Sequence, residues 1–363
     1  MNLPSIGIFA WLESRAFQAK YNLAYSNIPG LSFEEFSQIT GYQLPSDFDL
    51  NKNEQKGSKM LTEVLCENYE CEQSSVVTAT GGSEANFLVF LSLLEAGDEV
   101  IVEQPGYEPL WKTPEAFGAH VGFWERRFED RYQLDLETLK EMITKKTKLI
   151  VLTNLHNPSG VLAKKESLKG LSEIAQDHEV HVLIDEIFLD GAHPRPPSAF
   201  GYSNIIISSS MTKVYGIGGL RTGWIIAEPE VAHRCQQAKA HTSVCSPYLS
   251  EMMTAYLLKY GRKQALQRYQ DIAHPNKKIV KTWVEDNKDI IDWVEPDGGI
   301  ICFLKYHKDI TSLELCERLF EKRNVLLVPG LCFNKYEFLR LSYVMDSECI
   351  NFGLKSLKTF LEL

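Results

Sequence analysis

The sequence is poor in the features that mark disulfide-rich, metal-binding and membrane-spanning proteins. Only eight cysteines are scattered over its 363 residues, and none forms a CxxC pair. That usage predicts reduced thiols and no metal site. The longest apolar stretch, FLVFLSLL at 87–94, is too short to span a membrane. No basic start precedes the short apolar N-terminal stretch, so we expect no signal peptide.

Positive charge is also in deficit. Lysine and arginine total 38 against 48 aspartates and glutamates, which gives a net charge of -10. This balance disfavours nucleic acid or an anionic membrane surface as a partner, although one or two local arginines can still bind a small phosphate. Internal repeats and low-complexity segments are lacking too. With 44% hydrophobic and 24% charged residues, we expect a soluble, cytoplasmic globular protein.

From residue 57 onward, short apolar runs alternate with helical patterns. The apolar runs include VIVE at 100–103, KLIVLTN at 148–154, VHVLIDE at 180–186 and NIIISSS at 204–210. Strands that are apolar throughout and separated by helices indicate a parallel sheet covered on both faces. We therefore predict an α/β, doubly wound, mostly parallel sheet, which binds its ligand at the carboxyl ends of the strands.

The pattern changes after about residue 245. A long helical stretch at 246–285 is followed by GGIICFLKY, an amphipathic helix at 312–323, two more strands and a terminal helix. Strands and helices that do not strictly alternate favour a second, smaller α+β domain. We predict a large domain at 31–245 and a small domain built from residues 1–30 and 246–363.

One lysine directly follows the apolar run at 204–210, within the glycine-rich segment SSSMTKVYGIGGLRTGWII. A lone loop lysine is usually a solvated surface residue. Here Ser210 precedes Lys213 and Arg221 follows it, so groups suited to an amine–aldehyde bond and to a phosphate occur close together. An amine must be neutral to act as nucleophile or base, and burial beside a cation lowers its pKa.

Three other segments place polar groups at a helix start or in apolar strands, where a polar group usually has a binding or structural role. In TATGGSEAN (78–86), Gly82 and Ser83 open a predicted helix whose free amides favour an anion, although a plain turn with a serine cap fits equally well. Asp185 ends an apolar strand, where a carboxylate is costly unless it is paired or caps a helix. Arg340 lies in the apolar strand FLRLSY and suits a carboxylate, either of a ligand or of a salt bridge.

These segments, in this order, resemble the class I/II (fold type I) pyridoxal-phosphate-dependent aminotransferases over nearly the whole chain from about residue 57. Two further motifs match the family. Tyr107 in QPGYEPL resembles the aromatic residue that stacks on the pyridine ring, and Asn157 in NPSG resembles the asparagine that binds the phenolic oxygen. The resemblance implies that the cofactor is pyridoxal 5′-phosphate, attached to Lys213 as a Schiff base.

The resemblance also implies roles for the remaining residues. Lys213 and Asp185 would be catalytic, the lysine as general acid/base and the aspartate as partner of the pyridine nitrogen. Arg340 and Asn157 would orient the substrate. The cofactor-binding residues would be Gly82, Ser83, Tyr107, Asn157, Asp185, Ser210, Lys213 and Arg221.

Two positions depart from the family pattern. Phe188 stands where the family usually has a tyrosine that donates to the phenolic oxygen. Lys52 stands about where a tyrosine usually reaches the phosphate of the partner subunit. The first departure leaves the cofactor assignment intact but bears on the type of reaction.

We predict a homodimeric enzyme that moves an amino group between an α-amino acid and a 2-oxo acid. A carbon–sulfur β-lyase, a decarboxylase or a cyclising enzyme of the same fold would use the same residues, and these alternatives stay open. A pyridoxal-phosphate-binding sensor without turnover is disfavoured, because such regulators carry an N-terminal DNA-binding domain for which this acidic chain has no room.

Overall fold

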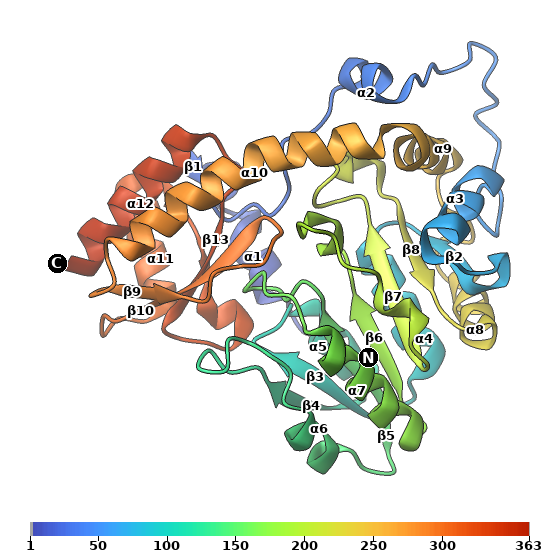
Figure 1. Ribbon diagram of the computed structural model, residues 1–363, viewed down its shortest axis with the longest axis horizontal. Helices are drawn as coiled ribbons and strands as arrows, with labels where there is room; N and C mark the ends of the chain where they lie inside the picture. Colours follow the sequence, from blue (N-terminus) through green and yellow to red (C-terminus); the bar gives the residue numbers. More distant parts are fainter. Residues whose placement is uncertain (1–2, 363) are drawn as a thin grey trace.

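The computed structural model describes residues 3–362 and contains a large sheet of seven strands (Figure 1). In spatial order the strands are β2 (Val76–Ala79), β8 (Gly223–Ile226), β7 (Ile205–Ser210), β6 (His181–Asp185), β5 (Thr147–Thr153), β3 (Glu99–Gln104) and β4 (His120–Glu125). Neighbours are parallel except at β8, which runs antiparallel to both β2 and β7. The prediction of a mostly parallel sheet is confirmed.

Successive residues of the central strands enter two different cores, because side chains alternate between the faces of a sheet. In β5, Leu149 and Val151 pack with α4 (Gly82–Leu93), α5 (Pro109–Ala116) and α8 (Pro229–Lys239). Ile150 and Leu152 pack on the opposite face with α6 (Leu136–Met142) and α7 (Lys165–Asp177). Helices on both faces explain why these strands are apolar throughout.

A smaller antiparallel sheet forms the second part of the molecule. Its order is β12 (Val328–Pro329), β13 (Phe338–Ser342), β10 (Ile301–Tyr306) and β9 (Ile291–Trp293). The helices α11 (Ser312–Arg323) and α12 (Ser347–Glu362) accompany it, and α11 has the bounds predicted from the sequence. The long helical stretch consists of α9 (Tyr248–Tyr256), a wider turn at Leu257–Gly261 and α10 (Arg262–Glu285), which reaches from the large sheet to the small one (Figure 1).

The two ends of the chain meet at the small sheet. Strand β1 (Tyr21–Asn22) pairs in parallel with β11 (Val325–Leu326), and the Tyr21 ring stacks on Phe352 of α12 at 4.0 Å. Beyond β1 the chain turns to the large sheet, where the Ile28 amide donates to the carbonyl of Lys213 at 3.2 Å. The N-terminal segment therefore connects the small sheet with the lysine loop.

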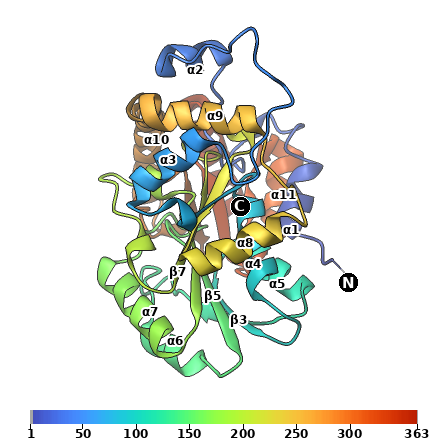
Figure 2. The same cartoon turned by 90° about the vertical axis from the view of Figure 1, so that its right-hand side faces the viewer.

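The segment between β1 and β2 contains two α-helices at the α9 side of the molecule. Helix α2 (Phe33–Thr40) packs on the wider turn that follows α9, and Figure 2 shows it beyond that helix. Helix α3 (Lys59–Tyr69) then lies against α9 and β2. The division of the chain into domains at residues 30 and 245 stays a prediction. Across residues 3–362, no helix is both long and apolar enough to cross a bilayer.

Candidate active site

A cavity of about 280 Å³ lies where β5, β6 and β7 end, at the edge of the sheet that the sequence predicts for a ligand. The predicted site residues that line it are Gly82, Ser83, Tyr107, Asn157, Asp185, Lys213, Arg221 and Arg340. They come from six separate segments: the start of α4, strands β6 and β13 of the two sheets, and three loops. Tertiary structure thus brings together residues that are up to 258 positions apart in the sequence, from Gly82 to Arg340.

One end of the cavity is built to accept an anion. Helix α4 begins at Gly82 after Gly81, whose φ of 85° favours glycine and whose helix start has no side-chain cap. A Cβ on Gly81 would lie 2.4 Å from a guanidinium nitrogen of Arg221, so only glycine lets that guanidinium rest against the turn. Free amides at a helix start and a guanidinium together suit a phosphate. Ser83 adds a hydroxyl at the same end.

Ser210 is the predicted site residue that lies behind the cavity wall. Its hydroxyl would be 3.6 Å from a Cβ on Gly82, and it donates to the Thr212 hydroxyl at 3.0 Å. Thr212 itself lines the cavity. Ser210 therefore supports the anion-binding end through its neighbours, and Thr212 is a wall residue that the sequence analysis missed.

Asp185 ends β6 and is held by two donors. Asn86 Nδ2 donates to its Oδ2 at 2.9 Å, and the Ile187 amide donates to Oδ1 at 3.0 Å. Asn86 is in turn fixed by the Ser208 hydroxyl at 2.5 Å. Burial raises the pKa of Asp185, while the Asn86 and Ile187 bonds and the Lys213 charge oppose the rise. Asn86 was missed as a site residue, although it ends the quoted segment 78–86.

Lys213 points its amine into the cavity from the loop after β7. The amine donates to Ser26 Oγ at 3.1 Å and to Asn27 Oδ1 at 3.2 Å, both in the N-terminal segment. Burial lowers the pKa of Lys213 to about 7, helped by the charges of Arg340 and Arg221 and opposed by Asp185. The lysine is therefore ready to act as a neutral amine near neutral pH.

Arg340 projects from β13 of the small sheet and is 2% exposed. Its Nη1 donates to Asn157 Oδ1 at 3.4 Å and its Nη2 to the Ala24 carbonyl at 3.1 Å. Within residues 3–362 it forms no ion pair, and its Nε has no hydrogen-bond partner. Burial lowers the pKa of Arg340 to about 10. A buried guanidinium with free donors is suited to an incoming carboxylate.

The buried pair of Glu103 and Arg126, which the sequence analysis also missed, supports the loop of Asn157. Glu103 at the end of β3 accepts from the Thr153 amide at 2.7 Å and from its hydroxyl at 2.5 Å. The Thr153 hydroxyl accepts from the Asn157 amide at 2.8 Å, and Arg126 pairs with the other Glu103 oxygen at 2.6 Å. Apolar strand patterns hide such a pair, because Glu103 and Arg126 occur at the ends of runs.

Two observations test whether these residues fit pyridoxal phosphate. The Gly81 turn provides an anion cradle that a Cβ would fill, and Arg340, whose buried Nε has no hydrogen-bond partner, lines the same cavity as Lys213 and Asp185. An anion cradle, an amine of lowered pKa and a buried carboxylate match the phosphate, aldehyde and pyridine nitrogen of that cofactor. Phe188, at the position of the missing tyrosine, lines the same cavity. The donor set fits.

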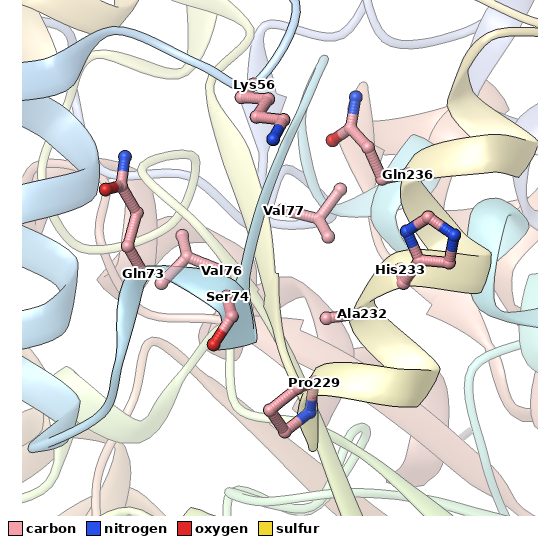
Figure 3. Close-up of a pocket in the computed structure, with 9 residues that line it drawn as sticks. All are labelled: Lys56, Gln73, Ser74, Val76, Val77, Pro229, Ala232, His233 and Gln236. Carbon is pink, nitrogen blue, oxygen red and sulfur yellow. The ribbon is translucent and has the colours of Figure 1, made fainter.

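A second hollow, of about 370 Å³, has a different character. Figure 3 shows it between the edge strand β2 and helix α8, with Lys56, His233 and Gln236 around its rim. None of the predicted site residues lines it, and its polar side chains are mostly solvent-exposed. The cavity at the strand ends therefore remains the candidate active site.

Comparison with known proteins decides the family. The sequence profile described as aminotransferase class I and II matches residues 36–357. The chain belongs to the class I and II aminotransferase family. Its cofactor is pyridoxal 5′-phosphate, and the fold is that of the fold type I enzymes, as the motifs predicted.

Three individual proteins are similar to this chain over most of its length. A solved pyridoxal-phosphate-dependent aminotransferase from Streptococcus suis 89-1591 is 28% identical, with a TM-score of 0.93 over 100% of this chain and 98% of its own. A probable aspartate/prephenate aminotransferase of Aquifex aeolicus is 30% identical over 82% of this chain and 79% of its own. Capreomycidine synthase of Streptomyces vinaceus is 27% identical over 98% of this chain and 93% of its own.

Proposed function

We propose that this class I/II aminotransferase moves an amino group between an α-amino acid and a 2-oxo acid, with Lys213 as the proton-transferring base. The carrying observation is the Arg340 guanidinium, which is buried without an ion pair among the described side chains and faces the same cavity as Lys213. A carboxylate on Arg340 would place the α-carbon of a bound amino acid between the guanidinium and the amine. The family membership supports this reaction.

The proposed roles follow from the contacts. Ser83, Arg221 and the α4 amides, backed by Ser210, would hold the phosphate. When bound, the cofactor supplies an electron sink for the electron pair left on the substrate α-carbon. Asp185, which is held by Asn86, would keep a proton on the pyridine nitrogen.

The substrate side of the cavity orients the bond to be broken. Arg340 and Asn157 would bind the carboxylate, and Tyr107 would lie against the cofactor ring. Lys213 Nζ would take the proton from the α-carbon and deliver it to the carbon that was the cofactor's aldehyde, which its lowered pKa allows near neutral pH.

Transfer of a labelled amino group tests the reaction directly. The holoprotein is incubated with a set of ¹⁵N-labelled amino acids and an unlabelled 2-oxo acid, and the label is followed by mass spectrometry. We expect the label to appear on the carbon skeleton of the 2-oxo acid. Consumption of the amino acid without transfer of its label would contradict transamination.

A synthase that retains the amino group is the second candidate, and the cyclising reaction left open by the sequence is of this kind. The observation in its favour is the match to capreomycidine synthase, which extends over 98% of this chain and so includes the N-terminal segment beside Lys213. In the same experiment, a product that keeps both the labelled nitrogen and its original carbon skeleton would favour this candidate.

We also propose a homodimer in which Lys52 of the partner subunit approaches the phosphate end. Ser83 and Arg221 are exposed at that end, and Lys52 lies outside the cavity of its own subunit, 4.7 Å from the Tyr248 ring centroid. Leu50 beside it is 88% exposed, as expected for a residue that a partner covers.

Mixing two inactive variants tests this arrangement. In a hybrid of Lys213→Ala and Lys52→Ala subunits, one site keeps its own Lys213 and the partner's intact Lys52. We expect activity to rise on mixing and the holoprotein to sediment as a dimer. A fully active monomer at micromolar concentration would contradict the homodimer. Unchanged cofactor affinity in Lys52→Ala would contradict the role of Lys52.

A cytoplasmic location is proposed from the thiols. All eight cysteines are free in the structure, and Cys235, Cys302, Cys316 and Cys349 are buried. Free thiols in this number fit a reducing compartment. Fractionation of the source cells with an activity assay checks the location.

A further inference from the structure

Helix α1 (Gly7–Glu13) forms an apolar wall of the candidate active site. Ile8, Phe9 and Leu12 line the cavity, and the Phe9 ring meets the edge of Tyr107 at a centroid distance of 6.4 Å. Phe9 is 47% exposed, so apolar surface remains uncovered at this wall. Covering such surface with an apolar group of a ligand favours binding, because apolar area is removed from water.

The wall is held in place from both parts of the molecule. The Ile8 amide donates to Glu108 Oε2 at 2.9 Å, which ties the start of α1 to the loop of Tyr107. The Trp11 indole donates to the Leu327 carbonyl at 2.8 Å, which ties α1 to the small sheet. With anchors on both sides, the positions of Ile8 and Leu12 are set before a substrate arrives.

The charged groups of the cavity are already committed. Those that line it are Asp185, Lys213, Arg221 and Arg340, and the proposed function uses each of them for the cofactor or for the substrate α-carboxylate. Within one subunit, a second carboxylate on the substrate would find no further cation among the lining side chains of residues 3–362, and the partner's Lys52 is proposed for the phosphate end. Burying a carboxylate without a partner is strongly unfavourable, because the charge loses its hydration and gains no compensating contact.

We propose that the α1 wall makes this enzyme select amino acids with an apolar side chain over dicarboxylic amino acids. The proposal rests on the proposed function, because it takes Arg340 as the site of the α-carboxylate. It separates this chain from relatives such as the Thermotoga maritima protein named aspartate aminotransferase, which is 28% identical over 79% of this chain. Ile8, Phe9 and Leu12 are then specificity-determining residues.

Equilibrium binding tests the preference without any turnover. Calorimetric titration of the holoprotein compares 4-methylpentanoate with succinate, two acids of the same shape that end in two methyl groups or in two carboxylate oxygens. We expect 4-methylpentanoate to bind at least about tenfold more tightly, since one apolar group is worth about 1–3 kcal/mol in a pocket. Equal or tighter binding of succinate would overturn the proposal, as would failure of both acids to bind.

A matched pair of variants assigns the preference to α1. Leu12→Arg places a cation in the wall and should reduce or reverse the preference for 4-methylpentanoate. Leu91→Arg adds the same charge at a 38%-exposed leucine of α4 that does not line the cavity, and it should leave the preference unchanged. An unchanged preference in Leu12→Arg would show that α1 is not the selecting wall.

The binding experiment and the labelling experiment can fail separately. Loss of label transfer with a clear preference for 4-methylpentanoate would overturn transamination and leave the apolar wall standing. Label transfer together with tighter binding of succinate would leave transamination standing and overturn the apolar wall.

Discussion

Two arginines of this protein are equally buried, yet their surroundings differ in charge. Arg126 is 0% exposed and pairs with Glu103 at 2.6 Å, whereas Arg340 is 2% exposed, donates to the Asn157 amide oxygen and a backbone carbonyl, and lies over the Phe333 ring. Each has one nitrogen without a hydrogen-bond partner in the described part of the chain. The decisive difference is therefore the carboxylate beside Arg126.

Lys239 and Lys213, the two lysines whose pKa is lowered, show a related contrast. Lys239 is 0% exposed, donates to Thr78 and Ser246 hydroxyls at 3.1 Å, and is influenced by the Glu251 charge. Lys213 instead faces the cavity, where the charges of Arg340 and Arg221 lower its pKa and the Asp185 charge opposes them. A cation neutralised by a neighbouring anion serves the framework, and an unneutralised one costs stability and needs a ligand.

The largest effect is expected from the lysines. Lys213→Ala should lower turnover by about 10³-fold or more, because nucleophile and general base are lost together. Cofactor should still bind through the Arg221 end, as absorbance of the dialysed protein will show. Lys239→Ala, the matched control, should lower the free energy of unfolding and retain turnover. Turnover of Lys213→Ala within tenfold of the original protein would remove the contrast.

The arginine pair should differ next in stability. Arg126→Met leaves Glu103 buried and unpaired, so it should reduce the free energy of unfolding by about 3–5 kcal/mol. Arg340→Met abandons no carboxylate, and the apoprotein should be as stable as the original or more so. Urea unfolding of both apoproteins measures the difference. Equal losses would show that the charge environments do not separate the two residues.

Substrate binding, in contrast to stability, should depend on Arg340. Arg340→Lys keeps the charge but loses the planar fork, and we expect amino acids and 2-oxo acids to bind about 2–4 kcal/mol more weakly. Cofactor affinity should hardly change, as titration of the apoprotein will show. If amines without a carboxylate are weakened as much as amino acids, Arg340 does not hold the carboxylate.

The lowered pKa of Lys213 predicts a pH dependence of the apoprotein. Between about pH 7 and pH 10 the unfolded chain holds a proton on Lys213 that the folded protein lacks, since the ordinary lysine pKa is about 10.4. The free energy of unfolding should therefore rise with pH in this window, by at most about 1.4 kcal/mol per unit from this group. Subtracting the profile of Lys213→Met isolates the contribution. A pH-independent difference would contradict the lowered pKa.

The smallest expected effect concerns Phe188, which is 2% exposed and lies with its ring centroid 5.6 Å from Lys213 Nζ. Phe188→Tyr adds a donor toward the phenolic oxygen of the cofactor. The pKa of the cofactor–Lys213 linkage should fall by roughly one unit, because a charge-assisted hydrogen bond is worth about 1.5–3 kcal/mol. Absorbance titration of the holoproteins measures it, with Phe123→Tyr as control. An unchanged or raised value would place the new hydroxyl away from that oxygen.

Much of the fold and site follows from the sequence because their signals are local. Strands buried on both faces must be apolar throughout, so the central strands and their parallel pairing could be predicted. Helix α11 has the predicted bounds, since its apolar spacing and threonine cap are adjacent in the sequence. The sequence singles out Lys213 and Asp185 because they lie at or just after the ends of apolar runs, and Asn157 through its NPSG motif; their roles stay predictions.

Only the tertiary structure decided which distant groups support those residues. Asn86 lies 99 positions from Asp185, and Glu103 lies 50 from Thr153, so no local pattern connects them. The antiparallel course of β8, the place of Ser210 behind the wall and the α1 wall itself likewise depend on how separate elements pack. Sequence by itself determined the chemistry, because residue types at strand ends limit it. Packing decided the charge around each group, because neutralisation depends on neighbours in space.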